Sequence, residues 1–227
     1  MRFITAVALA LIAVGCADAG QSAFCESLSQ ELSSSDLKSL SQESSWEDMH
    51  TCAEQGNAYA QSNLGLFYRT GIGVPNDDVE AARWFQSASE QGLPVAQHSL
   101  GYMYMHGMGV TEDNAEGFRL WRSAAEQGLV EAQFDLGIRY EQGYGVPEDI
   151  VLSYMFYNLA AAQGHEISQR YKNGHEGEMT REQIAEAQRL SREWLEALSP
   201  RRQLAHEEKP ATDVGPRRSN GRWVVCV

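Results

Sequence analysis

The residues that could act as nucleophiles lack the companions that such chemistry needs. Lys38 follows Ser35 at the distance of one helical turn, and a lysine so placed can activate a serine. The lysine-threonine-glycine segment that accompanies this pair in acylating enzymes is absent, and the match falls in a serine-rich stretch, 33–45. No GxSxG segment occurs, and no pair of carboxylates stands out from a generally acidic sequence. We therefore expect no catalytic residue and no enzyme activity.

Candidate ligands for metals and nucleotides are similarly scattered. The six histidines show no metal-ligand spacing, and the four cysteines do not cluster with them. A GxG pattern occurs at Gly71 and Gly73, but neither a third glycine nor a strand accompanies it as phosphate-binding loops require. We expect no metal site and no cofactor.

Composition and charge narrow the class of partner. Apolar residues make up 43% of the 227 residues, which is enough to build a core. The chain has 18 Lys and Arg against 31 Asp and Glu, a formal charge of -13. Such a charge repels a phosphate backbone, so nucleic acid is excluded as the expected partner.

A 36-residue repeat accounts for most of the chain, with full copies at 56–91, 92–127 and 128–163. In the first copy, Ala60, Leu64 and Tyr68 are spaced by four residues, which predicts one buried stripe of an α-helix. Gly65 lies in the middle of that helix, at a cost of about 1 kcal/mol relative to alanine, so we expect a neighbouring helix to approach closely there. Gly71 then predicts a left-handed helix end.

The second half of each copy predicts another helix. Asp77 is expected to cap its first turn, with Glu80 reaching back to complete a capping box, and Asp113 with Glu116 repeats the arrangement. Small and aromatic residues at helical spacing follow, and a Gln-Gly pair ends each copy. A lone hairpin cannot bury its apolar faces, so we expect stacked copies to share one continuous core.

The ends of the repeat array set the domain boundaries. We expect an N-terminal helical cap at 20–55 and a solenoid at 56–199, whose last part, 164–199, is a degenerate fourth copy. This part is expected to end in an amphipathic closing helix that starts with a capping box at Thr180 and Gln183. Residues 200–227 are basic and contain proline, which predicts a mobile tail.

The first residues have the layout of a secretory signal peptide: Arg2, then an apolar run too short to span a bilayer. Cleavage after Ala19 is favoured, giving a signal peptide at 1–19, and a lipid anchor at Cys16 is the alternative. We thus expect an exported protein, periplasmic or secreted, with no integral membrane span. In an oxidising compartment we expect Cys25 and Cys52 to form a disulfide, and Cys226 then has no expected disulfide partner within the chain.

The repeated phrase resembles the Sel-1-like repeat, a relative of the tetratricopeptide repeat. The second copy carries this resemblance at Ala96, Leu100, Gly101, Tyr104, Gly107, Gly109, Val110, Asp113, Trp121, Ala124, Ala125, Gln127 and Gly128. The resemblance implies an all-α, right-handed superhelix of helix-turn-helix repeats. It also implies a non-enzymatic adaptor of the bacterial envelope that binds proteins or peptides. The alternative is a secreted hydrolase acting on β-lactams or the cell wall, but such members carry a cysteine pair in each repeat, and these repeats have none.

Partner recognition is expected at columns that vary between copies, because the invariant columns hold the solenoid together. On the first helices, two such ladders are predicted to line the concave face and bind an extended peptide: Asn63, Ser99 and Asp135, and Phe67, Met103 and Arg139. A third ladder, Leu66, Tyr102 and Ile138, is predicted to pack between repeats. The protein is expected to be a monomer.

Overall fold

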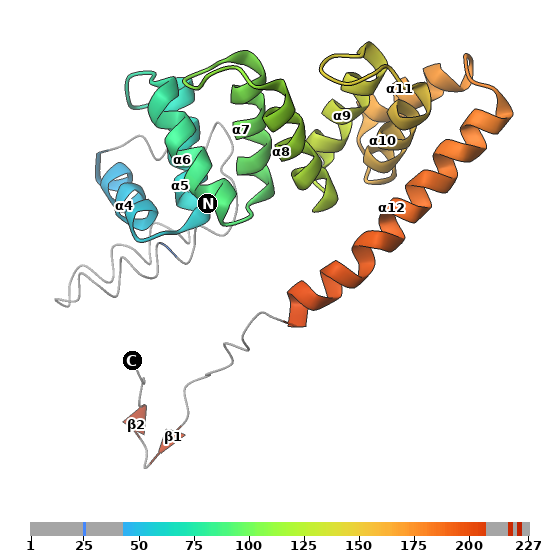
Figure 1. Ribbon diagram of the computed structural model, residues 1–227. Helices are drawn as coiled ribbons and strands as arrows, with labels where there is room; N and C mark the ends of the chain where they lie inside the picture. The colour runs from blue at the N-terminus through green and yellow to red at the C-terminus, as the bar shows by residue number, and fades with distance from the viewer. Residues whose placement is uncertain (1–24, 26–42, 208–217, 220–221, 224–227) are drawn as a thin grey trace.

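The computed structural model describes residues 25, 43–207, 218–219 and 222–223, and in this part of the chain most residues are helical. Each repeat contributes two helices of similar length (Figure 1). The helices are α4 (Glu43–Glu54), α5 (Ala58–Thr70), α6 (Asp78–Glu90), α7 (Pro94–His106), α8 (Asn114–Glu126), α9 (Val130–Gln142), α10 (Ile150–Ala162), α11 (Glu166–Glu176) and α12 (Arg181–Glu207).

Each helix from α4 to α10 packs against the next one along the chain, and α12 packs against α10. The helix pairs α5–α6, α7–α8 and α9–α10 therefore stack as successive hairpins (Figure 1). The prediction of an all-α repeat solenoid is confirmed. In such a fold each unit contacts only its neighbours, so the surfaces of the first helices form one continuous side.

Glycine ends the first helix of every full repeat, as predicted. Gly71, Gly107 and Gly143 have φ of 70°, 62° and 69°, a region that side chains with a Cβ disfavour. The amide of Gly71 donates to the Phe67 carbonyl at 2.9 Å, which completes the left-handed cap.

Aspartate begins each second helix, but the glutamate three residues later does not complete a capping box. The Asp113 carboxylate accepts from the amides of Ala115 and Glu116, both at 3.0 Å. The Asp113 amide donates to the carbonyl of Tyr104 at 2.9 Å, so no donor remains for Glu116. Glu116 pairs with Arg119 instead, and Glu80 likewise pairs with Arg83. The reciprocal arrangement does occur at Thr180 and Gln183, where both predicted bonds form.

The glycine inside each first helix makes room for an aromatic ring from the second helix of the same repeat. A Cβ built on Gly101 would lie 2.5 Å from the Trp121 ring, and one built on Gly137 would lie 2.6 Å from the Tyr157 ring. Atoms of real side chains do not approach so closely. The predicted close approach is confirmed, and the neighbour at Gly65 is again a ring, that of Phe85.

The core runs along the solenoid as three clusters, not as the single continuous core we expected. Leu64, Leu100 and Leu136 each lie in a different cluster, and each is almost fully buried. Leu66 packs against both the first and the second cluster. Helices α7 and α8 contribute to both the second and the third. The division follows from the architecture, because each helix pair buries its faces only against adjacent pairs.

Helix α12 closes the array by covering α10, which is apolar on all sides (Figure 1). Ala187 and Leu198 are buried, and Trp194 packs edge-on against Phe156 with ring centroids 5.3 Å apart. The helix continues past Pro200 to Glu207, eight residues beyond the expected boundary at 199. The residues after the proline are mostly good helix formers. Two short strands, β1 (Arg218–Ser219) and β2 (Arg222–Trp223), pair antiparallel beyond the helices.

At the other end, a disulfide joins Cys25 to Cys52 at the end of α4. The Asn57 side chain donates to the Cys25 carbonyl at 2.8 Å, which ties this residue to the start of α5. The expected signal peptide, Cys16, the Ser35–Lys38 pair and Cys226 lie outside the described residues.

Candidate functional site

Three of the six residues predicted to bind a partner are buried. Asn63 and Phe67 are inaccessible to solvent, and the ring of Trp46 on α4 packs edge-on against Phe67 with centroids 5.4 Å apart. Met103 is inaccessible within the cluster formed mainly by α6 and α7. Variation between copies at these positions therefore reflects different packing partners, and these three side chains offer no surface in this structure.

The other three predicted residues, Ser99, Asp135 and Arg139, are partly exposed. The Asp135 carboxylate lies 2.7 Å from Nε2 of His98, so this pair joins the first helices of two adjacent repeats. The Arg139 guanidinium lies over the Trp121 ring, 5.2 Å from its centroid. These contacts hold Asp135 and Arg139 in fixed positions at the junction between repeats two and three.

Only part of the third ladder, Leu66, Tyr102 and Ile138, packs between repeats as predicted. Leu66 packs against two core clusters and Ile138 is half-buried. Tyr102 is 37% exposed and stacks on His106 with ring centroids 4.1 Å apart. Tyr102 is therefore available to a partner, on the same side of the solenoid as Ser99.

An aromatic patch on α9 and α11, made of Phe134, His165 and Tyr171, was not predicted from the sequence. The Phe134 ring packs edge-on against His165 and Tyr171, with centroids 4.9 and 5.7 Å apart. Tyr171 is 42% exposed, while Tyr157 beneath the patch is inaccessible. The 36-residue offset could have found the patch, because Tyr171 occupies the position of Asp135 in the degenerate fourth copy.

Beside this patch, a serine, a histidine and a glutamate lie close together but are not arranged for nucleophilic catalysis. Nε2 of His175 lies 3.0 Å from Oγ of Ser153 and 3.9 Å from the Glu141 carboxylate. Both groups face the same ring nitrogen, whereas a catalytic triad places the carboxylate on the opposite nitrogen. Ser153 is also inaccessible to solvent. This arrangement suits a structural link between α9, α10 and α11.

Burial and hydrogen bonding perturb two tyrosines of α10. Burial raises the pKa of Tyr154 to about 12, and its hydroxyl donates to Glu176 at 2.8 Å. Burial also raises the pKa of Tyr157, whose hydroxyl donates to Glu141 at 2.7 Å. Both phenols therefore stay protonated and act as donors at neutral pH.

A pair of glutamines recurs in every full repeat, and sequence reasoning missed it. The side-chain amide of Gln163 donates to Gln133 at 2.9 Å, and the pairs Gln127–Gln97 and Gln91–Gln61 repeat this bond at 2.8 and 2.7 Å. The amide of Gln133 donates in turn to the Ala125 carbonyl in the preceding repeat. Their identity in all three copies was the available signal.

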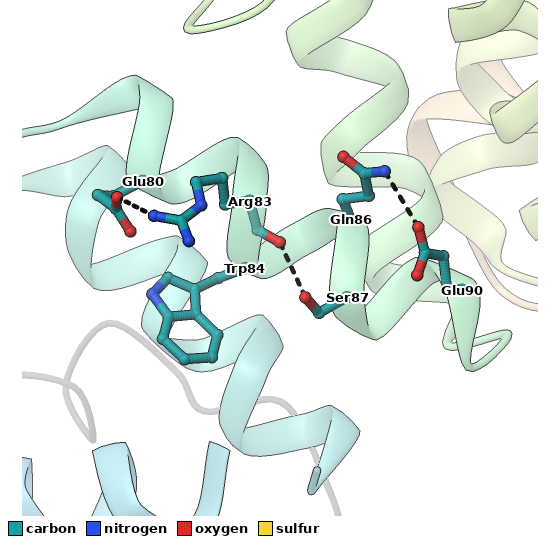
Figure 2. Close-up of a pocket in the computed structure, with 6 residues that line it drawn as sticks. All are labelled: Glu80, Arg83, Trp84, Gln86, Ser87 and Glu90. Carbon is teal, nitrogen blue, oxygen red and sulfur yellow. Dashed lines mark hydrogen bonds and ion pairs between the residues drawn. The ribbon is translucent and has the colours of Figure 1, made fainter. Parts of the chain in front are cut away.

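A shallow pocket of about 270 Å³ lies on α6, and its described lining comes from that helix alone (Figure 2). Arg83 pairs with Glu80, and Gln86 donates to Glu90, so the polar groups bind one another. No group of three or more metal-ligating side chains occurs within the described residues. None of the helices described is both long and apolar enough to cross a membrane.

Comparison with known proteins gives a consistent result. The family model for the Sel1 repeat matches residues 58–93, 94–129 and 130–165. A crystal structure of a Sel1 repeat protein from Oxalobacter formigenes is 41% identical, with a TM-score of 0.51, over 56% of this chain and 96% of that one. No curated protein matches the chain.

A second solved structure is a longer protein, c5321, a protective antigen present in uropathogenic Escherichia coli strains that displays an SLR fold. It is 30% identical to this chain, with a TM-score of 0.64 over 78% of this chain. The chain spans only 38% of the length of that antigen.

Proposed function

Because this chain belongs to the Sel1 repeat family, we propose that it is a non-enzymatic scaffold that binds a protein or peptide partner on the surface of its first helices. Sel1 repeat proteins are generally protein-interaction scaffolds. The observation that carries the proposal for this chain is the exposure of large apolar side chains on α7 and α11, namely Tyr102, Ile167 and Tyr171.

The binding surface that we propose is the concave side of the solenoid, and we call it the first-helix face. It consists of the accessible side chains of α7, α9 and α11: His98, Ser99, Tyr102, Phe134, Asp135, Ile138, Arg139, Ile167 and Tyr171. Apolar and aromatic groups surround the contact between His98 and Asp135 there, and aromatic side chains are enriched in the centre of protein interfaces.

The disulfide between Cys25 and Cys52 supports an oxidising, exported environment. We propose that the protein works in the bacterial envelope as a monomer, after removal of residues 1–19 or with a lipid anchor at Cys16. Fatty-acid labelling that is lost in Cys16→Ala would select the anchored form.

Site-specific photo-cross-linking tests the binding surface. A cross-linker placed at Tyr102 or Tyr171 is expected to give a discrete adduct in envelope extract. The same group at Val79, which is 56% exposed on α6, is the matched control and should give none. Equal adducts from Val79, or no adduct from either tyrosine, would contradict the proposal.

A further inference from the structure

Building on the proposed scaffold function, we infer that the aromatic patch of Phe134, His165 and Tyr171 binds a cationic, apolar segment of a partner, in which Lys or Arg side chains alternate with apolar ones. The inference joins two observations: accessible aromatic rings on a rigid base, and an excess of negative charge on the helical body that carries them.

The patch is a preformed platform. Tyr157 packs beneath both Phe134 and Tyr171, with centroids 5.8 and 5.1 Å from theirs, and is itself inaccessible to solvent. Ile167 lies one helical turn before Tyr171 and is 48% exposed, so it extends the apolar surface along α11. Aromatic faces held in this way attract ammonium and guanidinium groups, and the surrounding apolar area favours aliphatic side chains.

Carboxylates border the same surface. Glu131 is exposed one helical turn before Phe134 and Asp135, and Glu166 is exposed beside His165. Arg139 on α9 and Arg170 and Lys172 on α11 are accessible cations on the same two helices, so these carboxylates give no local excess of negative charge. The negative surplus belongs to the whole body, because residues 43–207 hold 25 Asp and Glu against 12 Lys and Arg.

The negative charge of the helical body favours a ligand of positive charge. A surplus of negative charge on this scale attracts cationic segments and repels anionic ones, mainly through the rate of association. The exposed rings then favour a cationic segment that also carries apolar side chains over one that is wholly polar.

Fluorescence anisotropy with three labelled dodecapeptides tests the inference on the full chain with its disulfide intact. The peptides alternate Lys with Leu, Glu with Leu, and Lys with Ser. We expect the Lys–Leu peptide to bind with a Kd at least about tenfold lower than either of the others, and to weaken as salt rises.

Variants locate the binding. Tyr171→Ala should raise the Kd of the Lys–Leu peptide by about tenfold, and the charge reversal Glu131→Lys should raise it several-fold without disturbing the fold, because both residues are exposed. Val79→Ala is the control, since Val79 is 56% exposed on α6, outside the first-helix face, and should change nothing.

Three results would overturn the inference: equal affinity for the Glu–Leu peptide, indifference to both patch variants, or binding only by a chain that ends at Glu207. The last result would show that residues 208–227 occupy the patch. Failure here is distinguishable from failure of the scaffold function. An adduct between the cross-linker at Tyr171 and an acidic or uncharged segment would support the scaffold function and contradict the inference of a cationic ligand.

Discussion

Gly137 has no space for even one additional carbon atom. A Cβ there would lie 2.6 Å from Cε1 of Tyr157, a ring that is itself fully buried. We predict that Gly137→Ala lowers the free energy of unfolding by about 1–3 kcal/mol, because the clash outweighs the gain in helix propensity of about 1 kcal/mol. Urea unfolding followed by circular dichroism measures the change.

Gly174→Ala provides the matched control. Gly174 also lies inside a helix, but a Cβ added there would meet no atom within 4 Å, so this variant should be more stable by about 0.5–1 kcal/mol. If both variants gain stability, the ring is not what excludes a side chain at 137.

The invariant residues could be predicted from the sequence, and the variable ones could not. Ala60, Leu64 and Gly71 repeat at fixed spacing, and their roles follow from the geometry of a single helix. Phe67 and Arg139 occupy the same position in their repeats, but their exposure depends on neighbouring helices. Trp46 packs against Phe67, which is buried, whereas Arg139 lies over Trp121 and stays partly exposed. Nothing in the repeat itself specifies those neighbours.

At the scale of elements, a hydrogen bond joins α10 to α11, and its contribution to stability depends on pH in the alkaline range. Tyr154 of α10 donates to Glu176 of α11, and burial raises its pKa from 10 to about 12. Between these values the unfolded chain loses this proton while the folded chain keeps it. Stability should therefore fall as pH rises above 10. We predict a shallower fall for Tyr154→Phe, measured as urea midpoints from pH 8 to 11.

Tyr102→Phe is the control for this effect, because Tyr102 is 37% exposed, and its pH dependence should match that of the unmodified protein. Parallel curves for all three proteins would show that Tyr154 does not contribute to the alkaline loss.

The order and type of the elements follow from the 36-residue period, but two of their properties do not. Helix α12 runs through Pro200, because the favourable residues after it outweigh a local break that the sequence pattern predicts. Helix α11 keeps its place although Lys172 and Asn173 replace the usual Leu and Gly, since Ser168 and His175 still pack inward. Local helix propensity decides the first case, and tertiary contacts decide the second.

At the scale of the whole molecule, the disulfide holds the first end of the array. We predict that Cys25→Ser with Cys52→Ser lowers the free energy of unfolding by roughly 3 kcal/mol, because the unfolded chain regains the freedom of a loop of this length. The loss should be confined to α4 and α5, since each unit contacts only its neighbours. Hydrogen exchange would show faster exchange there and unchanged rates in α9 and α10.

Reduction of the unmodified protein with dithiothreitol should reproduce the same pattern of exchange. A uniform rise in exchange over all helices would mean instead that the solenoid unfolds as one cooperative body, and a variant as stable as the parent would show that the crosslink adds nothing.

The same glutamine bond lies inside each repeat, between Gln61 and Gln91, Gln97 and Gln127, and Gln133 and Gln163, and Gln61 and Gln133 each also donate to a backbone carbonyl of the preceding unit. Removing one period from the gene, or duplicating it, leaves the internal glutamine bond of every remaining repeat intact. Unequal recombination can therefore lengthen or shorten the solenoid in whole units, and only the variable contacts at the new junction, such as that of His98 with Asp135, would change.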